Sequence, residues 1–239
     1  MLTKDGKYLF LAFDHCIEHG AQKYEIDLNP KRIAKIAERG KVDALIIPLG
    51  SYNFSKPKVN VLIKVTGKTE LVEEENQIQA KIAFLEELKG KNIVGIAATV
   101  YVGSKYEHLM LENFARLRME ARKRKKLITG FFYPRTKKYD RYSYEAVAYS
   151  ARLGCEMDAD IIKTYYTGSK ESFKKVVEKC FKPIVIAGGP KIEEKDFIKN
   201  VKDAIEAGAS GIAVGRNVWE REDNEAIELL KELREVVHG

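Results

Sequence analysis

Lys163 stands at the end of a short apolar stretch, "ADIIKTYY", which covers residues 159–166. A lysine that is buried beside other cations has a lowered pKa, and its free amine can attack a carbonyl carbon to form a Schiff base. The iminium withdraws electrons, so the carbon–carbon bond one carbon away can break or form. Lys64, in "VLIKVTG", leaves a similar stretch, and spacing alone does not choose between the two amines. The structural alternative for Lys163 is a lysine that reaches solvent or pairs with a carboxylate such as Asp160.

Two glycine turns near the C-terminus have the composition of an anion site. "AGGPK" contains Gly188, Gly189 and Lys191, and "VGRN" contains Gly215 and Arg216. Glycine lets backbone N–H groups approach an oxyanion closely, and arginine adds positive charge. The pattern favours a phosphate site over glycines that only close tight turns.

Short apolar runs alternate with amphipathic segments along the whole chain. The expected strands are residues 8–15, 43–50, 59–67, 92–103, 127–135, 159–166, 182–190 and 210–217. The expected helices are residues 31–40, 76–90, 106–126, 143–154, 170–180, 194–208 and 224–237, with little room for a helix between the second and third strands. Continuous apolar runs are typical of parallel strands that are covered on both faces.

Eight such strands in 239 residues predict one fold class. Eight βα units are the content of a TIM (β/α)8 barrel, which typically takes about 250 residues. The expected organisation is α/β, with one TIM-barrel domain over residues 1–239. A doubly wound open sheet is the second choice, because it usually has fewer strands.

In a TIM barrel, chemistry lies where strands end and βα loops begin. The first strand ends in Asp14 and His15, the fifth in Tyr133 and Arg135, and the sixth in Lys163. The two glycine turns follow the seventh and eighth strands, where such barrels usually bind phosphate. We therefore expect an acid, a phenol, a lysine and an anion site to meet at one face.

The composition limits the classes of partner that the chain is expected to bind. With 42 Lys and Arg against 35 Asp and Glu, the net charge of +7 suits an anionic small molecule or a nucleic acid. The basic run at residues 121–126 lacks interleaved aromatics and is better explained as a helix C-terminus, so we expect no nucleic-acid partner. No apolar stretch is long enough for a membrane span, and three unevenly spaced cysteines favour the cytoplasm.

Five motifs, in order, carry a family resemblance: "FDHCIEHG", "FFYPR", "ADIIKTYYTGSKESF", "VIAGGPK" and "DAIEAGASGIAVGRNVWE". Together they resemble the archaeal-type class I fructose-bisphosphate aldolase family, which includes Schiff-base aldolases and transaldol-type synthases of archaeal aromatic biosynthesis. The resemblance spans roughly residues 8–220. It implies a TIM barrel that uses a Schiff-base lysine, with no metal and no other cofactor, and it implies a homo-oligomer.

The resemblance selects Lys163 over Lys64 as the Schiff-base residue. It implies that Asp14 assists carbinolamine formation and dehydration, and that Tyr133 moves a proton to and from the enamine carbon. A structural hydrogen-bonded pair is the alternative for Asp14 and Tyr133.

The resemblance also implies the residues that hold the substrate. His15, His19 and Arg135 would line the substrate site, although a satisfied loop histidine is the alternative for His19. A phosphate of the substrate would be held by Gly188, Gly189, Lys191, Gly215 and Arg216.

The chain departs from the family pattern around the site of the second substrate. Cys16 replaces a common glycine, Ala21 a proline and Thr136 a glycine, and Phe131 stands where aldolases tend to carry tryptophan. The first expectation is reversible cleavage of fructose 1,6-bisphosphate to dihydroxyacetone phosphate and glyceraldehyde 3-phosphate. The same Schiff-base chemistry with another acceptor, giving 6-deoxy-5-ketofructose 1-phosphate or an aminodideoxyheptulosonate, is the close alternative.

Three alternative functions, from other classes of protein, have weaker support in the sequence. A phosphate-binding barrel could isomerise sugar phosphates by acid–base chemistry, with Asp14 or another carboxylate as the base. The basic run at residues 121–126 could bind nucleic acid. A metal-dependent aldolase needs clustered histidines, and the chain has four His in all, His238 among them at the tail.

Overall fold

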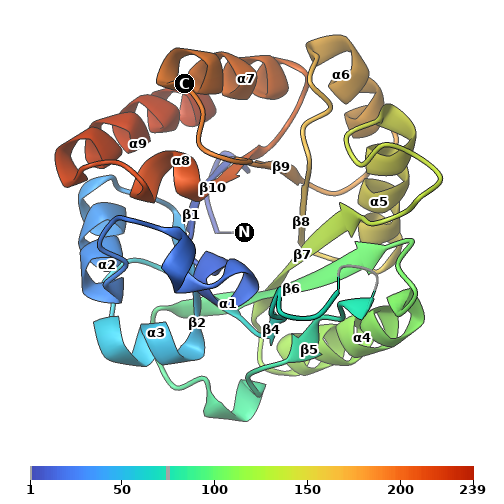
Figure 1. The fold of residues 1–239 in the computed structure, drawn as a ribbon, viewed down its shortest axis with the longest axis horizontal. Coiled ribbons are helices and arrows are strands. Elements are labelled where there is room, and N and C mark those ends of the chain that lie inside the picture. Colours follow the sequence, from blue (N-terminus) through green and yellow to red (C-terminus); the bar gives the residue numbers. More distant parts are fainter. Residues whose placement is uncertain (1, 74–75) are drawn as a thin grey trace.

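The computed structural model describes residues 2–73 and 76–239 and contains a closed barrel of eight parallel strands with helices around it (Figure 1). The strand order around the barrel is β1-β10-β9-β8-β7-β6-β3-β2. The barrel strands are β1 Tyr8–Ala12, β2 Ala44–Pro48, β3 Val61–Lys64, β6 Ile93–Val102, β7 Leu127–Pro134, β8 Ile161–Thr164, β9 Ile184–Ala187 and β10 Gly211–Val214. The expected TIM (β/α)8 barrel is confirmed.

Side chains alternate along each strand between two cores. In β1, Leu9 and Leu11 belong to the large core between strands and helices, whereas Phe10 and Ala12 belong to a smaller core inside the barrel. This period of two follows from the pleat of an extended chain. In β8, Ile161 lies inside the barrel and Ile162 outside, so the next residue, Lys163, points inward.

The helices that cover the barrel are mostly those that the sequence predicts. They are α1 His15–His19, α2 Pro30–Arg39, α3 Leu49–Ser55, α4 Glu107–Lys123, α5 Tyr144–Glu156, α6 Lys170–Glu178, α7 Glu194–Glu206, α8 Arg216–Trp219 and α9 Asp223–His238. Three begin at a side chain that accepts a hydrogen bond from the first turn, namely Asn29, Ser143 and Ser169. These caps satisfy amides that a helix start leaves without partners.

The helix predicted over residues 76–90 is wrong. Ala80–Lys81 forms β5, which pairs antiparallel with β4 (Thr66–Gly67), and Leu85–Glu87 is a single 3₁₀ turn, η3. The reason is the period of burial in this segment. Ala83 and Leu85 are buried while Ile82 and Phe84 are exposed, which is the alternation of an extended chain rather than of a helix.

Helices also occur where none was expected, namely α1, α3 and α8. α3 begins directly after Pro48 at the end of β2, so the connection to β3 needs little extra length. The strand expected over residues 59–67 is divided into β3 and β4, and β4 leaves the barrel to pair with β5.

The structure also bears on the basic run and on the absence of a membrane-spanning stretch. The basic run at residues 121–126 lies at the C-terminal end of α4, where Arg122 pairs with Asp160 and Arg124 with Glu86. Within the described ranges, no helix is both long enough and apolar enough to cross a membrane.

Candidate active site

The carboxyl ends of the strands surround a cavity of about 330 Å³. Eight of the predicted site residues line it: Asp14, His15, His19, Tyr133, Arg135, Lys163, Gly189 and Arg216. The structure therefore brings the acid, the phenol, the lysine and part of the anion site together at one mouth, as the strand ends predict.

Lys163 is almost fully buried, with 4% of its surface exposed. Its Nζ lies 4.4 Å from the centroid of the Phe131 ring, which follows from the pairing of these two residues between β7 and β8. The pKa of Lys163 is lowered from 10.5 to about 8, mainly by burial and also by the nearby Lys64 ammonium, while Asp14 and Glu18 oppose the shift. Lys163 therefore supplies a free amine at lower pH than an ordinary lysine does.

The structural alternative for Lys163 fails on the position of Asp160. Asp160 lies at the opposite end of the barrel, where its carboxylate accepts a hydrogen bond from the Ile128 amide (2.8 Å) and pairs with Arg122 (2.7 Å). Lys163 therefore faces the cavity at the carboxyl ends of the strands (the mouth), while Asp160 lies at the opposite end of the barrel (the floor).

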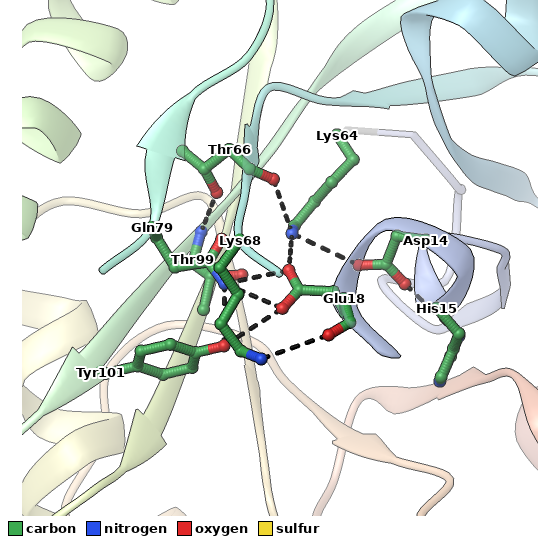
Figure 2. A network of polar contacts seen from close by, with 9 residues as sticks. All are labelled: Asp14, His15, Glu18, Lys64, Thr66, Lys68, Gln79, Thr99 and Tyr101. Atoms are coloured by element: carbon green, nitrogen blue, oxygen red, sulfur yellow. Dashed lines mark hydrogen bonds and ion pairs between the residues drawn. The ribbon is translucent and has the colours of Figure 1, made fainter. Parts of the chain in front are cut away.

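Lys64, the rival amine, is in a different state (Figure 2). It is fully buried, and its Nζ lies 2.9 Å from Glu18, 2.8 Å from the Thr66 carbonyl and 3.4 Å from Asp14. Burial alone would lower the pKa of Lys64, but Glu18 and Asp14 outweigh it and raise that pKa. Lys64 is held as an ammonium, so the geometry favours Lys163 as the nucleophile.

Asp14 lies directly after β1 and enters the cavity beside Lys64. Burial alone would raise its pKa, but Lys64 and other nearby cations outweigh burial and lower it to about 2. Burial lowers the pKa of the neighbouring His15 to about 3, so its ring is neutral although Nδ1 lies 3.6 Å from Asp14. Asp14 is therefore an ionised carboxylate whose charged partner is Lys64.

Tyr133 belongs to a group of aromatic rings around one guanidinium. Its ring stacks on Tyr165 with centroids 4.7 Å apart and an interplanar angle of 16°. Arg135 donates to the Tyr165 hydroxyl (2.8 Å) and lies 4.8 Å from the centroid of the Tyr101 ring. Burial raises the pKa of Tyr133 well above its usual value, so the phenol keeps its proton. The tyrosine stacks on Tyr165 and the carboxylate of Asp14 pairs with Lys64, which argues against a hydrogen-bonded pair of Asp14 and Tyr133.

Of the five residues expected to hold an anion in the loops after β9 and β10, Gly189 and Arg216 line the cavity. Gly189 adopts a positive φ of 69°, and Arg216 opens α8. Along the described part of the chain, Arg216 Nε is buried and makes no hydrogen bond, as a donor kept for a ligand would. Lys191 instead donates to the Glu220 carbonyl (2.9 Å) and does not line the cavity.

Gly188 and Gly215 also lie outside the cavity lining. Gly215 has a packing reason to be glycine, because a Cβ there would lie 2.5 Å from the His15 ring. The two loops are joined by Asn217, whose amide donates to the carbonyls of Gly188 and Pro190 at 2.8 Å each. Sequence reasoning missed Asn217, although it directly follows the "GR" pair.

His19 lines the outer part of the cavity, and its Nδ1 lies 3.2 Å from Glu70. Its side chain is 40% exposed. His19 is thus the last residue of α1, not a loop residue, and it lines the cavity while it contacts Glu70.

Several residues of the mouth went unnoticed in the sequence. Glu18, Gln79, Tyr101 and Tyr165 all carry polar groups at the site. Glu18 had a signal, because it stands four residues after Asp14 in "DHCIE" and so returns to the same side of one helical turn. Across residues 2–73 and 76–239, no group of three or more His, Cys, Asp or Glu could hold a metal ion.

Comparisons with known proteins agree with this geometry. Residues 8–221 match the model of the DeoC/LacD family aldolases. The chain is 35% identical to a class 1 fructose-bisphosphate aldolase of Thermoproteus tenax over 246 residues, covering 100% of this chain and 92% of that protein. A class 1 fructose-bisphosphate aldolase of Halobacterium salinarum is 34% identical over 92% of this chain and 87% of its own.

Among solved structures, the chain is similar to an archaeal fructose-1,6-bisphosphate aldolase whose catalytic lysine is covalently bound to the carbinolamine intermediate of its substrate. The TM-score is 0.93 at 33% identity, over 99% of this chain and 96% of the other.

Proposed function

Because the chain belongs to the DeoC/LacD family of aldolases, we propose that it is a class I aldolase that reversibly cleaves fructose 1,6-bisphosphate. The products would be dihydroxyacetone phosphate and glyceraldehyde 3-phosphate. The observation that carries the proposal is the contrast between two buried lysines: Lys64 is paired with Glu18 and Asp14, whereas Lys163 lies against the Phe131 ring and lines the cavity. The similarity to two class 1 fructose-bisphosphate aldolases supports the choice of substrate.

The first step would be attack of the free Lys163 amine on the C2 carbonyl. The Asp14 carboxylate would carry the proton that the nitrogen releases to the alkoxide, which gives a neutral carbinolamine. A second proton, taken up from solvent through Asp14, would let the hydroxyl leave as water while the nitrogen lone pair forms the C=N bond. The product is an iminium between Lys163 and C2. Asp14 is suited to this exchange because it is ionised before the substrate arrives.

Bond cleavage would follow from the iminium. The C4 hydroxyl proton would pass to solvent at the cavity as the C3–C4 electron pair moves into the iminium, which becomes an enamine and releases the aldehyde. Tyr133 would then protonate C3 and regain a proton from solvent, because its raised pKa keeps the phenol protonated at neutral pH. Hydrolysis of the iminium returns the free Lys163 amine and releases dihydroxyacetone phosphate.

The substrate would be held by its charge. Arg216 and the backbone at Gly189 would bind one phosphate, and His15, His19 and Arg135 would contact the rest of the sugar. Arg135 is held by Tyr165 and by the Tyr101 ring, so it would enter the complex already oriented.

A related synthase is the second candidate, and Phe131 is the observation that favours it. Phe131 is buried, and its ring faces the ammoniums of both Lys163 and Lys64. It offers no N–H donor where a tryptophan would, so a less polar acceptor than glyceraldehyde 3-phosphate fits the same Schiff-base chemistry. Methylglyoxal is such an acceptor, and it would give 6-deoxy-5-ketofructose 1-phosphate.

The test is a comparison of acceptors with one donor. The enzyme is given fructose 1,6-bisphosphate alone and then with methylglyoxal, and each product is quantified by mass spectrometry. We expect cleavage of fructose 1,6-bisphosphate that Lys163→Met abolishes and Lys182→Met, which removes an ion pair with Asp158 outside the mouth, preserves. Product formation only in the presence of methylglyoxal would replace the first candidate by the second.

A further inference from the structure

Two of the three cysteines lie together on the outside of the barrel. Cys155 belongs to the last turn of α5, and Cys180 follows the C-terminal end of α6. The two helices pack side by side around the barrel (Figure 1). Neither cysteine lines the cavity at the mouth, so the mechanism above gives them no role.

Two sets of contacts hold the segments around these cysteines against each other. Arg152, three residues before the cysteine of α5, donates to the Lys179 carbonyl (3.1 Å), and its guanidinium lies 5.0 Å from the centroid of the Phe181 ring. Asp158, three residues after the same cysteine, pairs with Lys182 at 2.9 Å. Because positions three apart in a helix share one face, the cysteine of α5 faces the same segment as Arg152, at residues 179–182.

Within this frame the two sulfurs are in contact. The Cys180 thiol donates a hydrogen bond to the Cys155 sulfur, and the backbone amides of residues 181 and 182 donate to the same sulfur. These donors lower the pKa of Cys155 against the effect of burial, while the contact between the thiols raises the pKa of Cys180. The proton of Cys155 is therefore the easier of the two to lose, and the resulting thiolate is the form that takes part in exchange with disulfides.

The two thiols differ in their access to solvent. Cys155 is 2% exposed and belongs to the core between strands and helices, whereas Cys180 is partly exposed at the edge of that core. Cysteine is a frequent core residue, so packing is the simplest role for the buried thiol. Packing alone does not require a second thiol that contacts the first from the solvent side. This arrangement gives an oxidant access to one sulfur and keeps the other beside it.

We propose that Cys155 and Cys180 form a dithiol site that closes to an intramolecular disulfide when it meets a disulfide oxidant. Cysteines whose side chains point apart cannot be bridged without backbone movement, whereas these two sulfurs already touch. The bond would join the end of α5 to the connection between α6 and β9, and it would enclose β8. The site goes beyond the proposed function and does not depend on it.

The exchange balances in two steps. Cys180 attacks one sulfur of the oxidant while its proton passes to the Cys155 thiolate, so the S–S bond of the oxidant breaks and one thiolate leaves. Cys155 then gives that proton to the departed thiolate and attacks the Cys180 sulfur, which expels the other half of the oxidant. This second thiolate takes up the proton that Cys155 first released to solvent. The two cysteines lose two electrons, and the oxidant gains them as it becomes two thiols.

The bond should change the stability of the chain. A disulfide stabilises mainly by restricting the unfolded chain, and this one would close a loop over residues 155–180. The midpoint of urea unfolding should therefore rise by roughly 1 M on oxidation and return when the protein is reduced.

The test uses the full chain, with oxidised glutathione as the oxidant. The reduced protein is incubated with this reagent, its remaining thiols are blocked with N-ethylmaleimide in denaturant, and it is digested with trypsin without reduction. The three cysteines fall in separate peptides, residues 8–23, 153–163 and 180–191. We expect most of the protein to yield a cross-linked peptide that joins 153–163 to 180–191, with Cys16 in the first peptide still blocked as a free thiol.

Three serine variants separate the roles of the thiols. Cys16→Ser is the matched control and should keep the cross-link. Cys155→Ser should accumulate a glutathione adduct on Cys180, because the thiol that resolves the mixed disulfide is gone. Cys180→Ser should leave Cys155 unmodified, since that sulfur is buried.

Folded wild-type protein that gives no cross-link with excess oxidant would overturn the proposal. A stable glutathione adduct on Cys180 in the wild type would also overturn it, because Cys155 would then fail to reach the mixed disulfide. A cross-link that forms only in urea, or one that includes Cys16, counts against the site in the same way. If Cys155→Ser does not fold, the wild type and Cys16→Ser still decide the question.

Discussion

At the floor of the barrel, where the strands begin, charged side chains have complete sets of partners. Asp43 accepts hydrogen bonds from the Leu9 amide at Oδ2 (2.7 Å) and from Arg234 at Oδ1 (3.2 Å), and His238 Nε2 lies 3.0 Å from Oδ2. Asp160, directly before β8, has a similar set of partners. Its carboxylate accepts a hydrogen bond from the Ile128 amide of β7 and pairs with Arg122. Each aspartate ties a strand to its neighbour and to a helix.

At the mouth, polar groups are buried with partners missing or with like charges close by. Lys163 rests on an aromatic ring near a second ammonium. Within the part of the chain that the structure describes, His15 Nδ1 and Arg216 Nε are buried and make no hydrogen bond. Such groups cost stability, since a buried donor without an acceptor loses its contact with water.

The difference indicates what each end of the barrel is for. The floor uses charge to close the barrel, and in the proposed function the mouth keeps charge available for a bound anion and a carbonyl. Substitutions at the mouth should therefore remove activity and spare or raise stability, whereas substitutions at the floor should do the reverse.

The largest expected effect is that of Lys163→Met. Loss of the nucleophile should reduce cleavage of fructose 1,6-bisphosphate by at least ~10⁴-fold. The free energy of unfolding should not fall, because an apolar side chain of similar length replaces a buried amine. Steady-state kinetics and urea denaturation measure the two results, and a variant that loses both activity and stability would break the comparison.

Tyr133→Phe should have the next largest effect. The phenol would be lost while the ring stack on Tyr165 remains, so kcat should fall by ~10²–10⁴-fold through slower proton transfer. The Schiff base should still form, so borohydride in the presence of dihydroxyacetone phosphate should still label Lys163. An unlabelled protein would show instead that Tyr133 acts before the iminium.

Asp43→Asn tests the floor. The amide keeps the shape of the side chain but cannot pair with the partly exposed Arg234 as an ion, so we expect the free energy of unfolding to fall by about 1–2 kcal/mol. The value of kcat for the folded enzyme should stay within about twofold, since Asp43 lies at the opposite end from the cavity. A large loss of kcat with unchanged stability would remove the distinction between the two ends.

The smallest effect concerns pH and stability. The pKa of Lys163 is lowered from 10.5 to about 8 on folding, so the unfolded chain binds the proton more tightly. The cost of burying the ammonium is present in full below pH 8 and disappears as pH rises to about 10.5. The stability advantage of Lys163→Met over the wild type, about 1–3 kcal/mol at pH 7, should therefore shrink over this window. Paired urea titrations at several pH values would show it, and a constant gap would contradict the lowered pKa.

Much of the site could be predicted because strand ends in a barrel share one face. Asp14, Tyr133 and Lys163 were identified from their positions after apolar runs, and the structure gathers them. The period of two along β8 also predicts that Lys163 points inward once Ile161 and Ile162 are assigned to opposite faces.

What could not be predicted depends on contacts between distant parts of the chain. The sequence gives Lys64 and Lys163 similar surroundings, and the two separate only because Glu18 and Asp14 come to lie beside Lys64. Gln79 reaches Glu18 across 61 residues, from a segment whose apolar spacing resembles a helix. There, the burial of Ala83 and Leu85 and the pairing of β5 with β4 outweighed helix propensity.

The most direct measurement of the central claim is reductive trapping. The enzyme is treated with dihydroxyacetone phosphate and borohydride, digested, and mapped by peptide mass spectrometry, with Lys163→Met and Lys64→Met as matched controls. The account predicts one reduced adduct on the peptide that carries Lys163, absent in Lys163→Met and still present on Lys163 in Lys64→Met at high pH. An adduct on Lys64, or a protein that cleaves its substrate without any adduct, would contradict it.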